Sequence, residues 1–262
     1  MTLEVIEHPL SPYAQKVKIA LTEKGQAFTT SIPNAMGSGS TPGEFIAASP
    51  RGEVPVLVVD GRSLFDSSII LEFIEDRWPT PALLPKDPFE RAKARTIEEL
   101  CDTHYEAITW GLSEIANFRR ATGEKAEAMQ KTAGEQIGRL NAWLDRQLDG
   151  ADWFGGETFG WGDICAAPFV QGAAGFGFAP APGSGLAAWL DRVRARPSVA
   201  TSFDQARQAL VAMSQVAGLV ESGVFKRQYR DHRLEWMIRS GGLDVVNRGV
   251  EKSNIRFNDE PR

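Results

Sequence analysis

The chain has 262 residues, of which 42% are hydrophobic and 24% are charged, and its formal net charge is −5. This composition is ordinary for a globular protein and excludes wholesale disorder. A mildly acidic chain also lacks the basic surface of a nucleic-acid-binding protein, so no nucleic-acid partner is expected.

Neither a targeting segment nor a metal site is indicated. The start of the chain has no basic region and no long apolar run, which argues against a secretory signal. The apolar stretch 164–182 is interrupted by glycine and proline and is a poor membrane span. Cys101 and Cys165 fall in segments with the pattern of buried helices, and no His or Cys residues have metal-ligand spacing. We therefore expect a cytoplasmic protein with no membrane partner and no metal.

Strand and helix signals alternate within about the first 78 residues. From Ser11 onward, apolar residues recur at helical spacing, and the Asp-Gly pair 60–61 between two apolar runs indicates a β-hairpin. We expect strands over 3–7, 27–32, 54–59 and 63–65, and helices that begin at Ser11, Glu44 and Ser67. This order predicts a small α/β sandwich.

The stretch 35–43 (AMGSGSTPG) within this region is expected to be a loop. It lacks the Gly-Lys-Ser/Thr sequence of a phosphate-binding loop, so a nucleotide ligand is not indicated.

Strand signals end at a proline-rich stretch that marks a domain boundary. Beyond it, long helices are expected over 89–118 and 124–148, with further helices over 163–175, 185–195 and 199–213. We therefore predict an N-terminal domain over 1–79, a linker over 80–88, an all-helical domain over 89–216 and a C-terminal helical extension over 217–262.

Four sequence blocks carry a family resemblance: HPLSPYAQKVKIALTEKG (8–25), RGEVPVLVVDG (51–61), FDSSIILEFIEDRWP (65–79) and FGWGDICAAPF (159–169). In sequence and spacing they resemble Ser-type glutathione S-transferases, particularly the plant tau and related bacterial classes. The resemblance covers roughly residues 1–215. It implies a thioredoxin-like α/β domain that binds glutathione, followed by an all-α helical bundle, and a homodimer.

The resemblance assigns the catalytic role to Ser11, whose hydroxyl would hold the glutathione thiol as a thiolate. The positive end of the helix that Ser11 opens would assist it. Considered alone, Ser11 followed by Pro12 is also a typical helix N-cap. Because the chain has serine where redox relatives have cysteine, disulfide exchange through a protein thiol is excluded at this position.

The remaining glutathione contacts follow from the same resemblance. Val54-Pro55 would form a cis peptide whose Val54 backbone pairs with glutathione, and Asp66 and Ser67 would bind its γ-glutamyl end. Taken alone, these would be an ordinary X-Pro bond and a helix start. Glu53 stands where many relatives have lysine, so it would repel the glycyl carboxylate unless Arg51 or Lys16 compensates for its charge.

For a hydrophobic second substrate, we expect an apolar pocket that includes Tyr13 and Tyr105, although such aromatic residues are more often part of a core. Asp163 follows Gly160 at capping-box spacing and is interpreted as a folding residue.

In the extension, Gly241-Gly242 would separate a longer helix from a shorter one. The extension either packs on the body of the protein or docks a protein partner.

Three functions are compatible with these residues. The first is a glutathione transferase acting on a hydrophobic electrophile. The second is a scaffold of the same fold that binds a protein and has lost turnover. The third is a glutathione-dependent peroxidase or β-etherase-like lyase.

Overall fold

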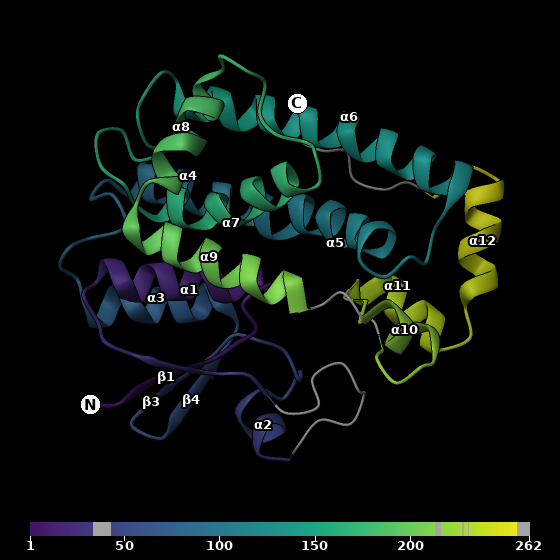
Figure 1. Cartoon of the computed structure of the whole chain (residues 1–262), viewed down its shortest axis with the longest axis horizontal. Coiled ribbons are helices and arrows are strands. Elements are labelled where there is room, and N and C mark those ends of the chain that lie inside the picture. The colour runs from purple at the N-terminus through teal and green to yellow at the C-terminus, as the bar shows by residue number, and fades with distance from the viewer. Residues whose placement is uncertain (34–42, 213–215, 227, 230, 256–262) are drawn as a thin grey trace.

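The computed structural model describes residues 1–33, 43–212, 216–226, 228–229 and 231–255. The predicted fold class is confirmed, because a small α/β layer built on a four-stranded sheet is followed by a helical half (Figure 1). The predicted loop 35–43 lies outside the described residues, except for Gly43.

The sheet consists of β1 (Leu3–Ile6), β2 (Thr29–Ser31), β3 (Val56–Val59) and β4 (Arg62–Phe65), in the order β2-β1-β3-β4. β1 pairs in parallel with β2 and antiparallel with β3, and β3 pairs antiparallel with β4. The β3–β4 turn is the predicted hairpin, in which Asp60 and Gly61 have φ values of 48° and 80°. Two consecutive positive φ angles match the right-handed twist of the strands, which is why Asp-Gly suits this turn.

Helices α1 (Pro12–Glu23) and α3 (Ser67–Arg77) lie between the sheet and the helical half, while the short α2 (Gly43–Ala48) lies on the other side of the sheet (Figure 1). This position buries α1 more completely than its apolar spacing predicts. Eight consecutive residues, 14–21, are buried, among them Lys16 and Lys18. The polar face of this helix is therefore in contact with protein.

The helical half consists of α4 (Pro88–Leu100), a π-helical turn η1 (Cys101–Tyr105), α5 (Glu106–Ala116), α6 (Gly123–Leu148), α7 (Trp161–Gly175), α8 (Gly185–Arg194) and α9 (Pro197–Ala212). The predicted helix 89–118 is thus a run of helix interrupted by a π turn. Such a turn inserts an extra residue into the helix and is often found at functional sites. Here it points Cys101 and Tyr105 into the core, while Asp102 faces α1.

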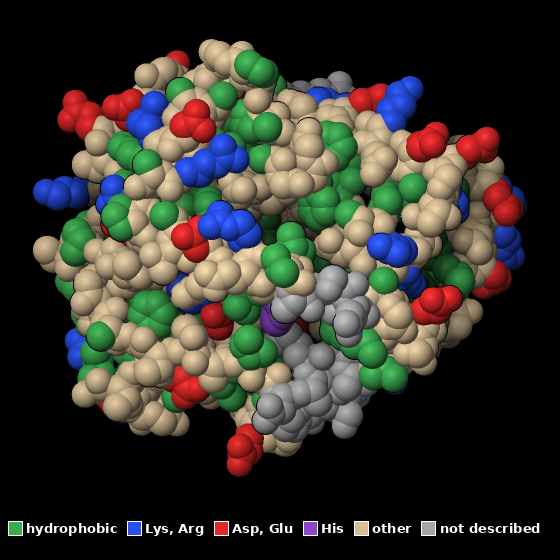
Figure 2. Space-filling view, viewed as in Figure 1, with side chains coloured by type: hydrophobic (Ala, Val, Ile, Leu, Met, Phe, Trp, Pro, Cys, Tyr) green, Lys and Arg blue, Asp and Glu red, His purple; other side chains and the backbone are tan. Residues whose placement is uncertain are grey.

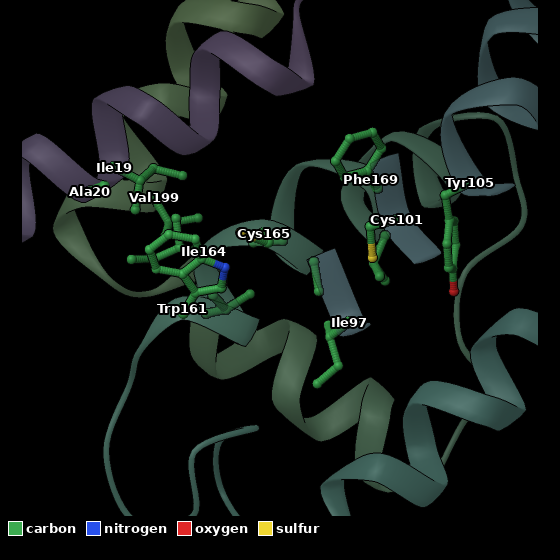
Figure 3. Packing of buried hydrophobic residues seen from close by; sticks show 14 of the residues in the cluster. Ile19, Ala20, Ile97, Cys101, Tyr105, Trp161, Ile164, Cys165, Phe169 and Val199 are labelled. Atoms are coloured by element: carbon green, nitrogen blue, oxygen red, sulfur yellow. The ribbon is translucent and has the colours of Figure 1, made fainter. Parts of the chain in front are cut away.

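A single hydrophobic core joins the two halves. Figure 3 shows Ile19 of α1 near Trp161 and Ile164 of α7. Cys101 and Phe169 belong to the same cluster. Both cysteines are fully buried, and burial raises the pKa of each thiol well above its ordinary value.

The extension contains α10 (Val216–Glu221), α11 (His232–Arg239) and α12 (Leu243–Glu251) at the end of the helical half (Figure 1). The predicted break at Gly241-Gly242 is present, and Gly241 has φ 82°. The flanking helices have 8 and 9 residues, so the expected difference in their lengths is wrong.

The described helices include none with the length and apolar character needed to cross a membrane. On the face shown in Figure 2, acidic and basic side chains are interspersed.

Candidate functional site

Three of the sequence blocks meet at one edge of the sheet. The last residue of β1, Ile6, is paired with Val56 at the start of β3, and Val56 is paired with Phe65 at the end of β4. The segment after β1, which leads to Ser11, therefore lies at the same edge as Pro55 and Asp66. Strand register alone brings these blocks together, although up to about sixty residues of chain separate them.

Ser11 is the N-cap of α1. Its backbone is extended, with φ −75° and ψ 114°, and its Oγ accepts a hydrogen bond from the Ala14 amide at 3.3 Å. Among the described residues, nothing accepts the Ser11 hydroxyl proton. The hydroxyl can therefore donate to an anion at the positive end of the helix.

The Val54–Pro55 peptide bond is cis, as the resemblance implies. Pro55 is buried, and Val54 precedes the first residue of β3 that pairs with β1. Within the described residues the backbone of Val54 makes no hydrogen bond. Its N–H and C=O groups can therefore pair with an extended ligand, as a neighbouring strand would.

Asp66 and Ser67 form the beginning of α3. Asp66 has φ 74°, and its carboxylate accepts from the Ser68 amide at 3.1 Å. Ser67 is 6% exposed, and its hydroxyl has no partner among the described residues. Burial alone would raise the pKa of Asp66. Arg51 and the amides at the helix start have the opposite and larger combined effect, so the pKa of Asp66 lies below its ordinary value.

Arg51 compensates for the charge of Glu53. Its Nε lies 3.2 Å from Glu53 Oε2, and its Nη2 lies 2.8 Å from Asp66 Oδ2. The Arg51 side chain is 42% exposed, so these ion pairs are in contact with water. Because exposed pairs of this kind contribute at most about 1 kcal/mol, an incoming charged ligand can rearrange them.

Lys16 does not contribute to this compensation. It is fully buried between the two halves, with Nζ 2.7 Å from Glu98 Oε1 and 2.6 Å from Asp102 Oδ2. Glu98 also accepts hydrogen bonds from the Ser68 hydroxyl and from Trp161 Nε1, each at 2.6 Å. We call Lys16, Glu98 and Asp102 the buried triad.

The buried triad has two carboxylates and one ammonium. Burial raises the pKa of Asp102 to about 6, and Lys16 opposes this rise. The other oxygen of this side chain, Oδ1, is buried without a described partner. The sequence signal for this triad is Lys16 itself, which stands between the core residues Ala14 and Val17 of α1.

Of the two expected pocket residues, Tyr13 lies beside the site and Tyr105 does not. The half-buried Tyr13 donates its hydroxyl to the carbonyl oxygen of Asp102 at 2.7 Å, so it joins the start of α1 to the π turn. Tyr105 is 0% exposed and donates to Asn141 Oδ1 at 2.6 Å. It offers no surface to a substrate, and we therefore leave it out of the proposed site.

Asp163 has the expected folding role. Its Oδ2 accepts from the Gly160 amide at 2.9 Å, and its Oδ1 accepts from Trp189 Nε1 at 2.8 Å.

A cavity of about 540 Å³ lies between α5 and α6, where it is lined by His104, Ile108 and Met129. In the described part of the chain, no cluster of three or more His, Cys, Asp or Glu residues could hold a metal ion.

Comparison with protein-family models matches residues 5–82 to the glutathione S-transferase N-terminal domain and residues 100–197 to the glutathione S-transferase C-terminal domain. The chain is 31% identical to a maleylacetoacetate isomerase of Pseudomonas aeruginosa, over 76% of this chain and 91% of that protein. It is 32% identical to glutathione S-transferase U6 of Arabidopsis thaliana over 61% of this chain, and it spans only 66% of that relative's length.

A solved structure of a glutathione S-transferase from Methylobacterium radiotolerans, in complex with glutathione sulfonate, is also similar. It superposes with a TM-score of 0.61 at 31% identity, covering 77% of this chain and 94% of that one.

Proposed function

The chain belongs to the glutathione S-transferase superfamily of enzymes, and from this premise we propose that its Ser11 hydroxyl activates the glutathione thiol for attack on a hydrophobic electrophile. The observation that carries the proposal is the position of Ser11. Its hydroxyl proton is available at the N-terminus of α1, at the sheet edge where Val54 and Asp66 also lie.

Ser11 and the N-terminus of α1 can supply the free energy needed to stabilise the glutathione thiolate. A free thiol of this kind has a pKa near 8.5, and lowering it by about 2 units requires about 2.7 kcal/mol of thiolate stabilisation. A hydrogen bond to an anion supplies roughly 1.5–3 kcal/mol. The helix N-terminus adds roughly 0.3–1 kcal/mol. Ser11 and α1 together therefore suffice without a general base.

Other residues at this edge would bind the rest of the tripeptide. The Val54 backbone would pair with the cysteinyl residue, as an added antiparallel strand does. The Ser67 hydroxyl would donate to the γ-glutamyl carboxylate, and the Asp66 carboxylate would accept from the ammonium group. Arg51 would then be shared between Asp66 and Glu53, which limits repulsion of the glycyl carboxylate by Glu53.

The test is the Ser11→Ala variant, measured with glutathione and an aryl halide. We expect kcat/KM to fall at least 10-fold while the KM for glutathione changes little, because the hydroxyl acts mainly on the thiolate. Ser11→Thr keeps the hydroxyl and should retain most of the activity.

Ser11→Ala also removes an N-cap, which costs about 1 kcal/mol of stability. The matched control is Ser184→Ala, which removes the cap of α8, where Ser184 Oγ accepts from the Ala187 amide at 3.1 Å. A Ser11→Ala rate within twofold of wild type, or an equal loss in Ser184→Ala, would show that Ser11 is not catalytic.

A second candidate function is a glutathione-dependent isomerisation, which is favoured by the similarity to a maleylacetoacetate isomerase over most of its length. The peroxidase and β-etherase-like lyase activities use the same thiolate. A panel of electrophiles, hydroperoxides, aryl ethers and cis-configured diketo acids, each assayed with glutathione, would separate these reactions.

The non-catalytic scaffold is a further candidate, and the apolar side chains that the extension exposes favour it. Trp236 and Ile238 of α11 are 67% and 50% exposed, and Val245 of α12 is 51% exposed. Calorimetry discriminates between an enzyme and a scaffold, because absent or millimolar glutathione binding would favour the scaffold.

We also propose a homodimer, supported by the 58% exposed Ile69 on α3. Sedimentation at micromolar concentration would test it.

A further inference from the structure

The extension contacts the proposed site at Glu53. Gln228 Nε2 lies 3.4 Å from Glu53 Oε1, next to the Val54–Pro55 bond. The next residue, Tyr229, has its ring centroid 4.3 Å from that of Trp110 on α5, with the ring planes at 70°. Two consecutive residues thus contact the α/β half and the helical half.

Other contacts hold this segment against the turn that follows α5. The Phe225 ring stacks on Phe118 with centroids 6.0 Å apart, and Arg120 Nη1 lies 3.4 Å from the Tyr229 hydroxyl. Phe118 is only 5% exposed, so it provides a buried anchor for the segment. Tyr229 itself is 57% exposed, which leaves much of its ring available to a ligand.

Trp110 lies on the side of α5 that does not face α6. The residues of α5 that face α6, such as Ala107, Ile108 and Gly111, line the groove between those helices, and Trp110 is not among them. Tyr13 holds the start of α1 against Asp102, eight residues before Trp110. Trp110 therefore lies on the same continuous run of helix as the π turn that Tyr13 contacts, about two turns beyond that contact.

We infer that Tyr229 and Trp110 form the outer aromatic wall of the second-substrate site, and that this site takes planar aromatic electrophiles. The inference rests on the proposed function. Edge-to-face aromatic geometry favours a third ring, because aromatic faces and edges carry opposite partial charges. With an aryl halide, the thiolate sulfur would form the carbon–sulfur bond, and the halide would leave with the electron pair of the broken carbon–halogen bond.

The test measures binding of three probes to the full chain by calorimetry: glutathione, S-methylglutathione and S-(2,4-dinitrophenyl)glutathione. We expect Tyr229→Ala to weaken binding of the aryl conjugate about 5- to 10-fold, and to change binding of the other two less than twofold. Trp110→Leu should have a similar effect, and the double variant should lose less than the product of the two losses. Tyr229→Phe keeps the ring and should bind as wild type does.

Trp236→Ala is the matched control, since Trp236 is another exposed aromatic residue of the extension. An aryl-conjugate affinity that Tyr229→Ala leaves unchanged or increases, or an equal weakening of all three probes, would overturn this inference while the proposed function stands. Failure of the wild-type protein to bind any of the probes would overturn both.

Discussion

Two clusters of charged side chains flank the candidate site, and they differ chiefly in their exposure to water. The buried triad joins α1 to α4 and the π turn, and its lysine is 0% exposed. The second cluster, Arg51 with Glu53 and Asp66, lies at the sheet edge with its arginine 42% exposed. Both clusters contain two carboxylates and one cation. The same charges therefore join the two halves of the chain where they are buried, and stay in contact with water where they lie at the sheet edge.

The largest expected effect in this comparison is that of Lys16→Met on stability. This change leaves two carboxylates buried without their cation, which should lower the free energy of unfolding by about 3–5 kcal/mol. Urea unfolding at pH 7 measures it. The triple variant Lys16→Met, Glu98→Gln, Asp102→Asn removes the unpaired charge and should recover part of the loss.

The matched control is Lys93→Met, because Lys93 pairs with Glu90 at 2.8 Å on the surface. It should leave stability unchanged. Equal stability of Lys16→Met and Lys93→Met would show that burial does not distinguish the two kinds of ion pair here.

A smaller effect is expected on the pH dependence of stability, through Asp102 of the buried triad. The folded-state pKa of Asp102 is about 6, whereas an unfolded aspartate has a pKa near 3.9. The folded state therefore binds this proton more tightly. The contribution of Asp102 to stability is fully present below pH ~4 and is lost as pH rises through 6.

Asp102→Asn should remove this dependence. The difference in unfolding free energy between wild type and variant should change by on the order of 2 kcal/mol between pH 4 and 7. Urea unfolding at several pH values measures the difference, which removes contributions common to both proteins, such as that of Asp163. Asp204→Asn, at an exposed surface pair, is the control. A pH profile of Asp102→Asn parallel to that of wild type would contradict the assignment.

The smallest effect on stability is expected in the exposed cluster. Arg51→Met should change the free energy of unfolding by less than about 1 kcal/mol. It should nevertheless weaken glutathione binding about fivefold, because Glu53 would then face the glycyl carboxylate of the ligand uncompensated.

Calorimetry measures the affinity, and Arg207→Met, at another exposed ion pair, serves as the control. A large loss of stability in Arg51→Met with unchanged glutathione affinity would reverse the roles assigned to the two clusters.

Features set by neighbouring residues could be predicted from the sequence. The Asp60-Gly61 hairpin, the Ser11 cap before Pro12 and the Asp163 contact to Gly160 each depend on residues a few positions apart. The cis bond at Pro55 followed from the family pattern.

Features set by distant residues could not be predicted in the same way. Lys16 pairs with a glutamate 82 residues further along the chain, so its local pattern could not show whether it faces water or the other half. An aromatic residue near the expected cleft predicts a pocket position for Tyr105, but the π turn directs it toward Asn141 in the core. The contact between Gln228 and Glu53 joins residues 175 positions apart, and no spacing rule covers it.

The burial of both cysteines has a consequence for the proposed reaction with electrophiles. A reactive electrophile alkylates any accessible thiolate, including one that belongs to the catalyst. Cys101 and Cys165 are the chain's only thiols, each is 0% exposed, and each is kept protonated by its surroundings. Since the thiolate is the reactive form, a chain with the proposed activity would not compete with the bound thiol and would be protected from inactivation by its own substrates.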